Sequence, residues 1–482
     1  MSQAAEGGAL PIALSAYLAI SRLAGPLAPI LLALRKRRGK EDPVRIAERL
    51  GHPGIARPKG PVVWLHGASV GEGMSLLPVI EALRRSPTPP FCLLTTGTVT
   101  SAQLLAPRLA DFGEDAAAHQ FAPVDTRTAV CRFLDRWRPD LAIWAESEFW
   151  PRLMWETGRR NIPMLLVNAR LSAKSAGAWA RAPEMACRLL GLFDAAFAQD
   201  DETAARLSSL GVAPGRLSVT GNLKMLLPPP AADETALADA REALGDRPCW
   251  LAASTHAPEE AAALDAHLTL SAKHPGLFTL IAPRHPDRGA EIAQMAALRG
   301  LPVTRRSGGE GPPPAGGAWI LDTLGEMGVW YRLVPVVFVG GSIAPMGGHN
   351  PFEPVALDAA VLAGPSTRNF APAYAALARV AGYRPLLSAD DLAGGVDALL
   401  TDTAARATMT AAAKGAVQAA LPDLAPILEK AHALLRPRTN GASPQPDVRN
   451  AALDPAGAAT EEQPVATTPE ALSFLRNDTK AG

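Results

Sequence analysis

The chain has 482 residues, too many for one ordinary hydrophobic core, which predicts two domains with additional segments. Its 47 basic and 47 acidic residues balance, so no net charge draws it to nucleic acid, and 48% hydrophobic residues exclude general disorder. The four cysteines form no CxxC pair, so neither a disulfide framework nor a zinc knuckle has support, which favours a reducing compartment.

The N-terminal segment, residues 10–34, is mostly apolar and is followed at once by the basic run RKRRGK. About twenty apolar residues cross a bilayer, but Arg22 costs about 2.5 to 3.5 kcal/mol there on insertion scales, and three prolines weaken the helix. We expect a membrane anchor, either a tilted spanning helix or a helix in the interface. Because Lys and Arg stay on the cytoplasmic side, we expect the globular part there too.

Beyond the basic run, short apolar stretches alternate with helix-length amphipathic segments, which is typical of parallel βαβ units. A triple proline at 228–230 interrupts the alternation and marks a linker. The pattern predicts two doubly wound sheets, with ligands at the carboxyl ends of strands in the cleft between domains. The predicted strands are residues 61–66, 91–96, 140–145, 163–168 and 194–199 before the linker, and 249–254, 277–283, 318–322, 334–341 and 359–365 after it.

The sequence HGASVGEG follows the first predicted strand and places Glu72 among three glycines. Two interpretations stay open: Glu72 is an acid stabilised by a helix dipole, or it is a general base facing the cleft. The glycine spacing also fits GxxxGxG of short-chain dehydrogenases, but none of the four tyrosines has a Lys four residues later, as that chemistry requires.

Two further motifs carry charge, one at a strand end and one at the domain junction. Glu146 and Glu148 lie in WAESEFWP, where we expect one glutamate to be functional and one structural. Lys224, in GNLK at the domain junction, is either a phosphate ligand or a solvated hinge lysine.

The second half carries three loops of interest. In APRHPDR, Arg284 offers a bidentate fork to phosphate or carboxylate, and Arg288 is expected in solvent. TLGEM is interpreted as a capping box, since Thr323 stands three residues before Glu326. RSGGEGPPPAGGA, from Arg306, is a Gly/Pro surface loop without chemistry.

GGSIAPMGGHNPFEP, residues 340–354, follows an apolar run and contains four glycines, which allow a ligand to approach the backbone. Asn350 and Glu353 stand three apart in a predicted first helical turn, where a carboxylate suits a ribose diol and free N–H groups suit a phosphate. His349 is interpreted as an ordinary packed histidine. Metal dependence has no support, because DxD, GxxxxGK[ST] and HExxH are absent from the sequence.

In this order, these motifs resemble the family of 3-deoxy-D-manno-octulosonic acid (Kdo) transferases of lipopolysaccharide assembly. Residues 21–34 resemble the membrane anchor of that family. The matching pieces, spanning roughly residues 35–370, are RKRRGKEDPVRIAERLG, WLHGASVGE, RFLDRWRPDLAIWAESEFWP, VNARLS, TGNLK, APRHPDR, LGEMG and FVGGSIAPMGGHNPFEPVAL.

The resemblance implies an α/β GT-B fold, two Rossmann-like doubly wound domains facing an interdomain cleft, plus an N-terminal membrane-anchor helix. It also implies transfer of Kdo from CMP-Kdo to a lipid A precursor, lipid IVA, at the cytoplasmic face of the inner membrane, without cofactor or metal. The expected divisions are an anchor with its basic flank at 1–40, an acceptor domain at 41–222, a CMP-Kdo domain at 223–436 and a disordered tail at 437–482.

By the same resemblance, Glu72 is the catalytic base and Lys224 aids the transition state. Glu146 is the second essential acid, although a register error of two residues makes it Glu148. The CMP-binding elements are Pro283, Arg284, Leu324, Gly325, Glu326, Asn350, Pro351, Phe352 and Glu353.

Two other functions remain to be weighed. A GT-B glycosyltransferase that uses a UDP-sugar has the same architecture and differs in nucleotide preference. A silent membrane-tethered scaffold binds no nucleotide, and the intact Glu72, Arg284 and Glu353 argue against it.

Overall fold

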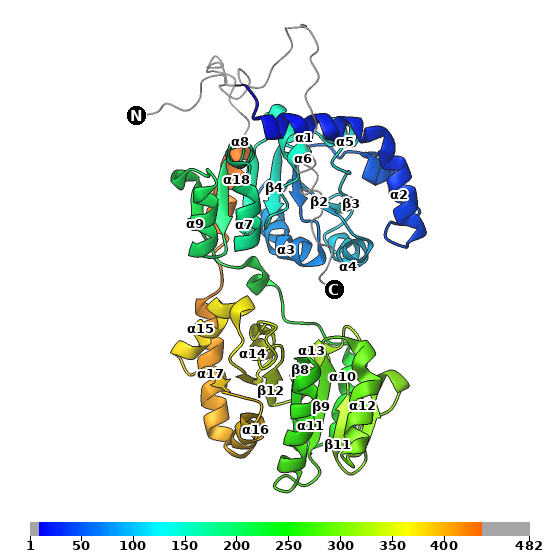
Figure 1. Ribbon diagram of the computed structural model, residues 1–482, viewed down its shortest axis with the longest axis vertical. Helices are drawn as coiled ribbons and strands as arrows, with labels where there is room; N and C mark the ends of the chain where they lie inside the picture. The colour runs from blue at the N-terminus through cyan, green and yellow to red at the C-terminus, as the bar shows by residue number, and fades with distance from the viewer. Residues whose placement is uncertain (1–8, 436–482) are drawn as a thin grey trace.

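Two parallel sheets organise the computed structural model, which describes residues 9–435 (Figure 1). The first sheet has seven strands in the order β3-β2-β1-β4-β5-β6-β7, and the second has seven in the order β10-β11-β9-β8-β12-β13-β14. Every strand pairing is parallel, with helices connecting the strands. The predicted pair of doubly wound domains is therefore confirmed.

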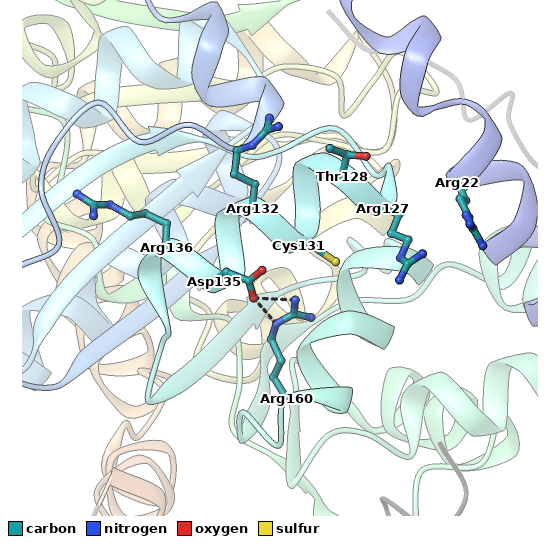
Figure 2. Close-up of a pocket in the computed structure, with 8 residues that line it drawn as sticks. All are labelled: Arg22, Arg127, Thr128, Cys131, Arg132, Asp135, Arg136 and Arg160. Carbon is teal, nitrogen blue, oxygen red and sulfur yellow. Dashed lines mark hydrogen bonds and ion pairs between the residues drawn. The ribbon is translucent and has the colours of Figure 1, made fainter. Parts of the chain in front are cut away.

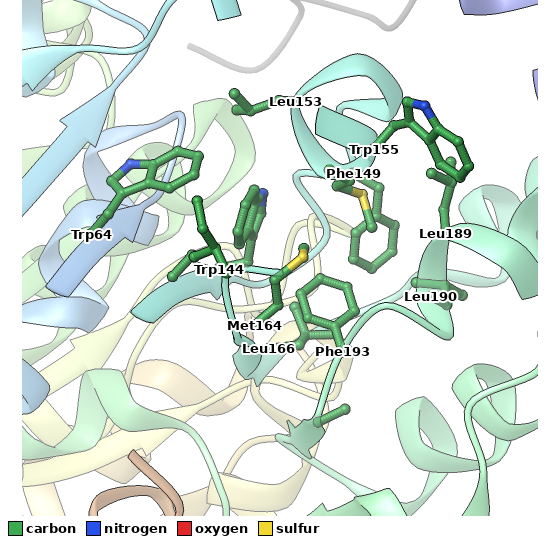
Figure 3. Packing of buried hydrophobic residues seen from close by; sticks show 14 of the residues in the cluster. Trp64, Trp144, Phe149, Leu153, Trp155, Met164, Leu166, Leu189, Leu190 and Phe193 are labelled. Atoms are coloured by element: carbon green, nitrogen blue, oxygen red, sulfur yellow. The ribbon is translucent and has the colours of Figure 1, made fainter. Parts of the chain in front are cut away.

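The N-terminal domain buries aromatic side chains against one face of its sheet (Figure 3). Trp64 of β1 and Trp144 of β4 meet edge to face with ring centroids 4.7 Å apart. Its strands are β1 Val62–His66, β2 Phe91–Thr96, β3 Ala117–Phe121, β4 Leu141–Ala145, β5 Met164–Ala169, β6 Ala195–Ala198 and β7 Leu217–Val219. Its helices include η2 Ile46–Leu50, α3 Val70–Arg84, α4 Val99–Ala110, α5 Arg127–Trp137, α6 Pro151–Arg159, α7 Ala173–Trp179, α8 Pro183–Leu190, α9 Asp201–Ser209 and η3 Pro214–Arg216.

The C-terminal domain repeats this plan. Its strands are β8 Cys249–Thr255, β9 Phe278–Pro283, β10 Val303–Arg305, β11 Gly317–Ile320, β12 Val336–Val339, β13 Ala360–Ala363 and β14 Arg384–Pro385. Its helices are α10 Glu234–Leu244, α11 Ala257–Ser271, η5 Pro286–Arg288, α12 Gly289–Leu298, η6 Arg306–Gly308, α13 Met327–Leu333, α14 Phe352–Ala356, η7 Arg368–Phe370, α15 Ala371–Arg379, α16 Asp391–Thr401 and α17 Thr403–Ala419.

All ten predicted strands are present, and four further strands were not predicted. The missed strands, β3, β7, β10 and β14, are the four edge strands of the two sheets. An edge strand pairs on one side only and is less enclosed, so its sequence lacks the continuous apolar run of a central parallel strand.

The chain crosses between domains twice. The short helix η4 (Leu223–Leu226) packs against α3, and Leu223 is buried in the N-terminal core. After the C-terminal domain, α18 (Ala425–Leu435) returns to the N-terminal core, where it contacts α3 and β4 and where Ile427 and Ala431 are buried. Both segments lie within the range 223–436 that the sequence assigned to the C-terminal domain, yet Leu223, Ile427 and Ala431 are buried in the other one. Met225 of η4 packs against the C-terminal core.

The N-terminal segment forms two helices joined by a bend: α1 (Ile12–Leu23) and, after η1 (Gly25–Leu27), α2 (Ala28–Arg37). Leu14 and Leu18 are buried against the domain. Within residues 9–435, no single helix is long and apolar enough to cross a bilayer, and the pair that satisfies length and composition together bends by 43°. The predicted anchor helix is not confirmed, and the predicted tail at 437–482 lies outside the described residues.

Candidate active site

Glu72 is the third residue of α3, directly after the loop that leaves β1. Its backbone N–H donates to Ser69 Oγ at 3.3 Å, and its Oε2 accepts from the N–H groups of Ala68 at 2.6 Å and Ser69 at 3.1 Å. These contacts form a capping box, which satisfies N–H groups that a helix start leaves unpaired. The structural interpretation of Glu72 as a helix-start acid therefore holds.

The carboxyl group of Glu72 also has the electrostatics of a base. Burial, reinforced by the negative charges of Glu148 and Glu146, raises the pKa of Glu72 from 4.5 to about 7. Three carboxylates therefore gather at the carboxyl ends of β1 and β4. A general base works best when its pKa lies near the working pH, so this cluster gives Glu72 a suitable proton affinity.

Lys224 of η4 supplies the positive charge of this cluster. Its Nζ lies 2.6 Å from Glu146 Oε1, and a methyl group placed on Gly71 would lie 3.2 Å from the same nitrogen. The ammonium therefore sits against the backbone next to Glu72. Of the two interpretations of Lys224, solvated hinge or site residue, this ion pair favours the second.

Glu146 and Asn168 are held in left-handed backbone conformations, with φ of 55° and 50°. Asn168 Nδ2 donates to Glu146 Oε1 at 3.4 Å, and Asn168 Oδ1 accepts from the N–H of Leu223 at 2.9 Å. Such conformations cost of order 1 to 3 kcal/mol each and gather at functional sites. Asn168 thus joins the end of β5 to η4 and fixes the Glu146–Lys224 pair. The matching piece VNARLS contains Asn168, but its pattern does not indicate this role.

Glu148 differs from Glu146 in its partner. Trp150 donates its indole N–H to Glu148 Oε2 at 2.9 Å. Burial raises the pKa of Glu148, and the charge of Glu146 raises it further, whereas the hydrogen bond from Trp150 acts to lower it. Glu146 is therefore the acid paired with a cation, and Glu148 is the acid whose charge has the larger effect on the pKa of Glu72.

In the C-terminal domain, Arg284 follows β9 directly. It has no ion-pair partner within residues 9–435, and its side chain is exposed. Its charge nevertheless acts on Glu353, whose pKa burial raises while hydrogen bonding from Asn350 and the charge of Arg284 oppose the rise. Asn350 Nδ2 donates to Glu353 Oε1 at 3.2 Å. The structure thus brings three of the predicted CMP-binding residues into one group.

One glycine-loop expectation is wrong, and a second is met only in part. The loop amides of residues 341–344 are not open to a phosphate, because they already donate to the buried carboxylate of Glu259. The helix α14 has five residues, and its first N–H, that of Phe352, donates to Asn350 Oδ1 at 3.1 Å. The anion bound by the amides of residues 341–344 is therefore the carboxylate of Glu259 and not a ligand.

His349 is more than an ordinary packed residue. Its ring stacks on that of His256 at 10°, with the two Nε2 atoms 3.2 Å apart. Burial first, and then the charges of Arg284, His256 and His285, lower the pKa of His349 to about 4. The imidazole is therefore neutral at pH 7 and can both donate and accept a hydrogen bond.

The turn at residues 323–326 is not the predicted capping box. The helix α13 begins at Met327 with Glu326 as its N-cap, and the Thr323 hydroxyl donates to the Glu326 carboxylate instead of capping a backbone N–H. Arg306 Nη2 also lies 2.9 Å from Glu326 Oε1, so the loop without predicted chemistry supplies this partner. Burial opposes the change, but hydrogen bonds from Arg306 and Thr323 lower the pKa of Glu326.

The remaining predicted CMP-binding residues lie next to these groups in the chain. Pro283 is the buried last residue of β9, Leu324 is 83% exposed, Gly325 has φ of 87°, Pro351 precedes α14, and Phe352 is the buried first residue of that helix. Arg288, expected in solvent, instead forms an ion pair with the buried Glu260 at 2.6 Å. Figure 1 draws α3 toward the C-terminal domain, and α13 and α14 toward the N-terminal one.

Residues 44–227 match the family described as 3-Deoxy-D-manno-octulosonic-acid transferase (kdotransferase). The 3-deoxy-D-manno-octulosonic acid transferase of Haemophilus influenzae is 33% identical over 428 residues, which cover 86% of this chain and 98% of that protein. The chain belongs to the Kdo transferase family. The relative of the same name from Bordetella pertussis is 36% identical over 334 residues, 67% of this chain and 76% of its own length.

Solved structures agree with the architecture. A glycosyltransferase from Rickettsia africae ESF-5 superposes with a TM-score of 0.53, covering 78% of this chain and 99% of that one. At 12% identity this likeness concerns the fold alone. Together with the two seven-stranded parallel sheets, it confirms the predicted GT-B fold of this Kdo transferase family member.

Proposed function

We propose that this Kdo transferase family member moves Kdo from CMP-Kdo to a lipid A precursor such as lipid IVA, as an inverting glycosyltransferase without metal or cofactor. One observation carries the proposal: the carboxyl of Glu72, with a pKa near 7, stands beside a Lys224–Glu146 ion pair at the carboxyl ends of the strands. Membership of the Kdo transferase family supports Kdo as the transferred sugar. The identity of the acceptor, a lipid A precursor, is part of this proposal.

In this mechanism Glu72 takes the proton of the acceptor hydroxyl as its oxygen attacks the anomeric carbon of Kdo. The bond from that carbon to the CMP phosphate oxygen breaks in the same step, so a single displacement inverts the configuration. Negative charge develops on the departing phosphate. Arg284 is suited to receive that charge because it is exposed and forms no ion pair within residues 9–435.

Lys224 and Glu146 act together in this proposal. A lysine held 2.6 Å from a carboxylate keeps a fixed position, and fixed charges stabilise a transition state without reorganising. Glu146 is then the acid that orients Lys224, which supports Glu146 over Glu148 as the second essential acid.

The direct test incubates purified protein with CMP-Kdo and lipid IVA and follows the lipid by mass spectrometry. We expect Kdo-containing products, and their masses report the number of additions. Glu72→Gln is expected to bind CMP as the wild type does while transfer collapses; near-normal turnover would remove Glu72 from the mechanism. Arg284→Ala is expected to weaken CMP binding by calorimetry. Tighter binding of UDP than of CMP would instead support a UDP-sugar donor.

We also propose that the protein binds the cytoplasmic face of the inner membrane through α1 and α2, which lie in the interface and do not cross the bilayer. One side of α1 is engaged by the domain: Tyr17 donates to Asp125 at 2.7 Å, and Arg152 donates to Ser21 Oγ at 3.0 Å. Elsewhere on α1, and along η1 and α2, large apolar side chains are exposed. They are Ile12, Ile20, Leu23, Leu27, Ile30, Leu31 and Leu34.

A basic hollow next to this apolar surface supports the interfacial arrangement (Figure 2). It measures about 900 Å³ and runs from Arg22 on α1 along the exposed side of α5. Its one carboxylate, Asp135, is paired with Arg160 at 2.8 Å. The arginines that line it are Arg22, Arg127, Arg132, Arg136 and Arg160. Anionic head groups attract such clusters by about 1 kcal/mol for each basic residue near the surface.

Membrane extraction separates the two arrangements. An interfacial protein is released by alkaline carbonate, whereas a spanning one stays in the pellet. In flotation with anionic vesicles, we expect the pair Ile30→Ser and Leu31→Ser to abolish binding, and Arg127→Gln with Arg136→Gln to weaken it. Retention after carbonate treatment, or equal binding to zwitterionic vesicles, would contradict the proposal.

A further inference from the structure

A fully buried carboxylate organises the loop after β12. Glu259 lies in the first turn of α11 and is 0% exposed. Its Oε1 accepts backbone N–H groups from Ser342 at 3.0 Å, Ile343 at 2.9 Å and Ala344 at 3.1 Å, and its Oε2 accepts those of Gly341 at 2.8 Å and His256 at 3.0 Å. Five main-chain donors thus surround one side chain.

This arrangement is an anion nest filled from within. Successive backbone N–H groups that converge on one point form concave sites for anions such as phosphate. Here the anion is the carboxylate of Glu259, and the hydrogen bonds compensate for removing its charge from water. The nest therefore cannot bind the phosphate of a nucleotide sugar while Glu259 occupies it.

A series of contacts links the nest to the candidate donor-binding residues. Gly348 donates its N–H to the carbonyl of Gly341 at 2.7 Å, which closes the loop on itself. Gly341 has φ of 65°, and a methyl group there would lie 3.0 Å from the His349 ring. Tyr374 donates to the carbonyl of His349 at 3.2 Å. The backbone that enters Asn350 is thereby fixed at both ends.

We propose that Glu259 is a positioning residue for the donor site: its buried carboxylate folds residues 341–344 so that His349, Asn350 and Glu353 meet the nucleotide donor in a fixed arrangement. This inference rests on the proposed function, because it takes CMP-Kdo as the donor and places Asn350 and Glu353, with the neighbouring His349, at the donor site. It adds that the phosphate is bound by side chains such as Arg284 and not by the amides of the glycine loop.

The chemistry of substitution gives an ordered expectation. Gln at 259 keeps the size but presents an NH₂ group to N–H donors, so the amides on one of the two oxygens lose their acceptor. Asp keeps the charge but is shorter by one methylene. We therefore expect donor affinity to fall in the order wild type, Glu259→Asp, Glu259→Gln. Leu264→Ala is the matched control, since Leu264 is a fully buried core residue of the same helix.

The experiment combines hydrogen exchange with steady-state kinetics on the full-length protein, at a temperature where every variant is folded. In Glu259→Gln we expect amides 341–344 to lose protection while those of β12 keep it. The KM for CMP-Kdo should rise roughly tenfold, which equals about 1.4 kcal/mol, and the KM for the lipid acceptor should stay within about twofold. Leu264→Ala should lower the melting temperature without changing either KM.

Three results would overturn the inference. They are unchanged protection of amides 341–344 in Glu259→Gln, a donor KM that rises no more than in Leu264→Ala, or an equal rise of donor and acceptor KM. A wild-type protein that transfers nothing from CMP-Kdo refutes the proposed function instead. In that case CMP titration of the same variants decides whether Glu259 positions a nucleotide site.

Discussion

Replacing Glu72 by glutamine should stabilise the protein at alkaline pH while it removes the proposed base. The folded protein raises the pKa of Glu72 from 4.5 to about 7, first through burial and then through Glu148 and Glu146. Between these two values the folded state binds more protons than the unfolded state, so this group lowers stability as the pH rises from about 4.5 through 7.

The size of the effect follows from the two pKa values. Each pH unit is worth about 1.4 kcal/mol, so ionised Glu72 costs roughly 3 kcal/mol above pH 7. Glutamine carries no charge at any pH and still serves a capping box at the third helical position. Glu72→Gln should therefore match the wild type near pH 4.5 and exceed it by up to about 3 kcal/mol at pH 8.

Scanning calorimetry at pH 5 and pH 8 measures this difference. For a domain of 150 to 250 residues, about 3 kcal/mol corresponds to a rise in melting temperature of roughly 6 to 12 °C. The matched control is Glu81→Gln on the same helix, an exposed acid paired with Arg85 that should show no such pH dependence. A Glu72→Gln variant no more stable than the wild type at pH 8 would refute the electrostatic argument.

Three further outcomes follow from the same contacts. Transfer should reach half its maximal rate near pH 7, and Glu148→Gln should move this midpoint to lower pH, because the charge of Glu148 raises the pKa of Glu72; an unmoved profile of kcat/KM would contradict this. Lys224→Met should lower kcat by about two orders of magnitude with CMP affinity by calorimetry nearly unchanged; a loss confined to CMP binding would place Lys224 elsewhere. Arg306→Ala removes the ion-pair partner of Glu326 and should weaken CMP binding, by about tenfold at most because Arg306 is partly exposed. An unchanged CMP affinity would show that Glu326 is not part of the nucleotide site.

The sequence predicted the centre of each sheet and not its edges. Central strands such as β4 and β12 are apolar along their whole length because both faces are covered. The edge strand β3 is AAHQF, and β14 is two exposed residues. Their place in the sheet depends on pairing with one distant neighbour, which local patterns do not encode.

The candidate site divides in the same way. Glu72, Glu146 and Lys224 could be predicted because each stands at the end of a strand or at the domain junction in a distinctive motif. Asn168 could not be, because it lies 22 residues from its partner Glu146. The role of Glu259 could not be either, because four of the five amides it binds lie more than 80 residues away. The local sequence around a carboxylate at a helix start does not show whether it caps only its own helix or also accepts N–H groups from a distant loop, as Glu259 does.

For Glu72, the alternatives of helix cap and general base do not exclude each other. Hydrogen bonds from Ser69 act to lower its pKa, as expected for a capping acid, while burial and the two neighbouring glutamates raise it further. A cap alone would leave the group ionised and weakly basic at pH 7. Burial first, and then the neighbouring carboxylates, would therefore turn an ordinary capping residue into a base, and the capping contacts keep its side chain in place. Because the charge of Glu148 raises the pKa of Glu72, Glu148 should influence the pH at which transfer begins.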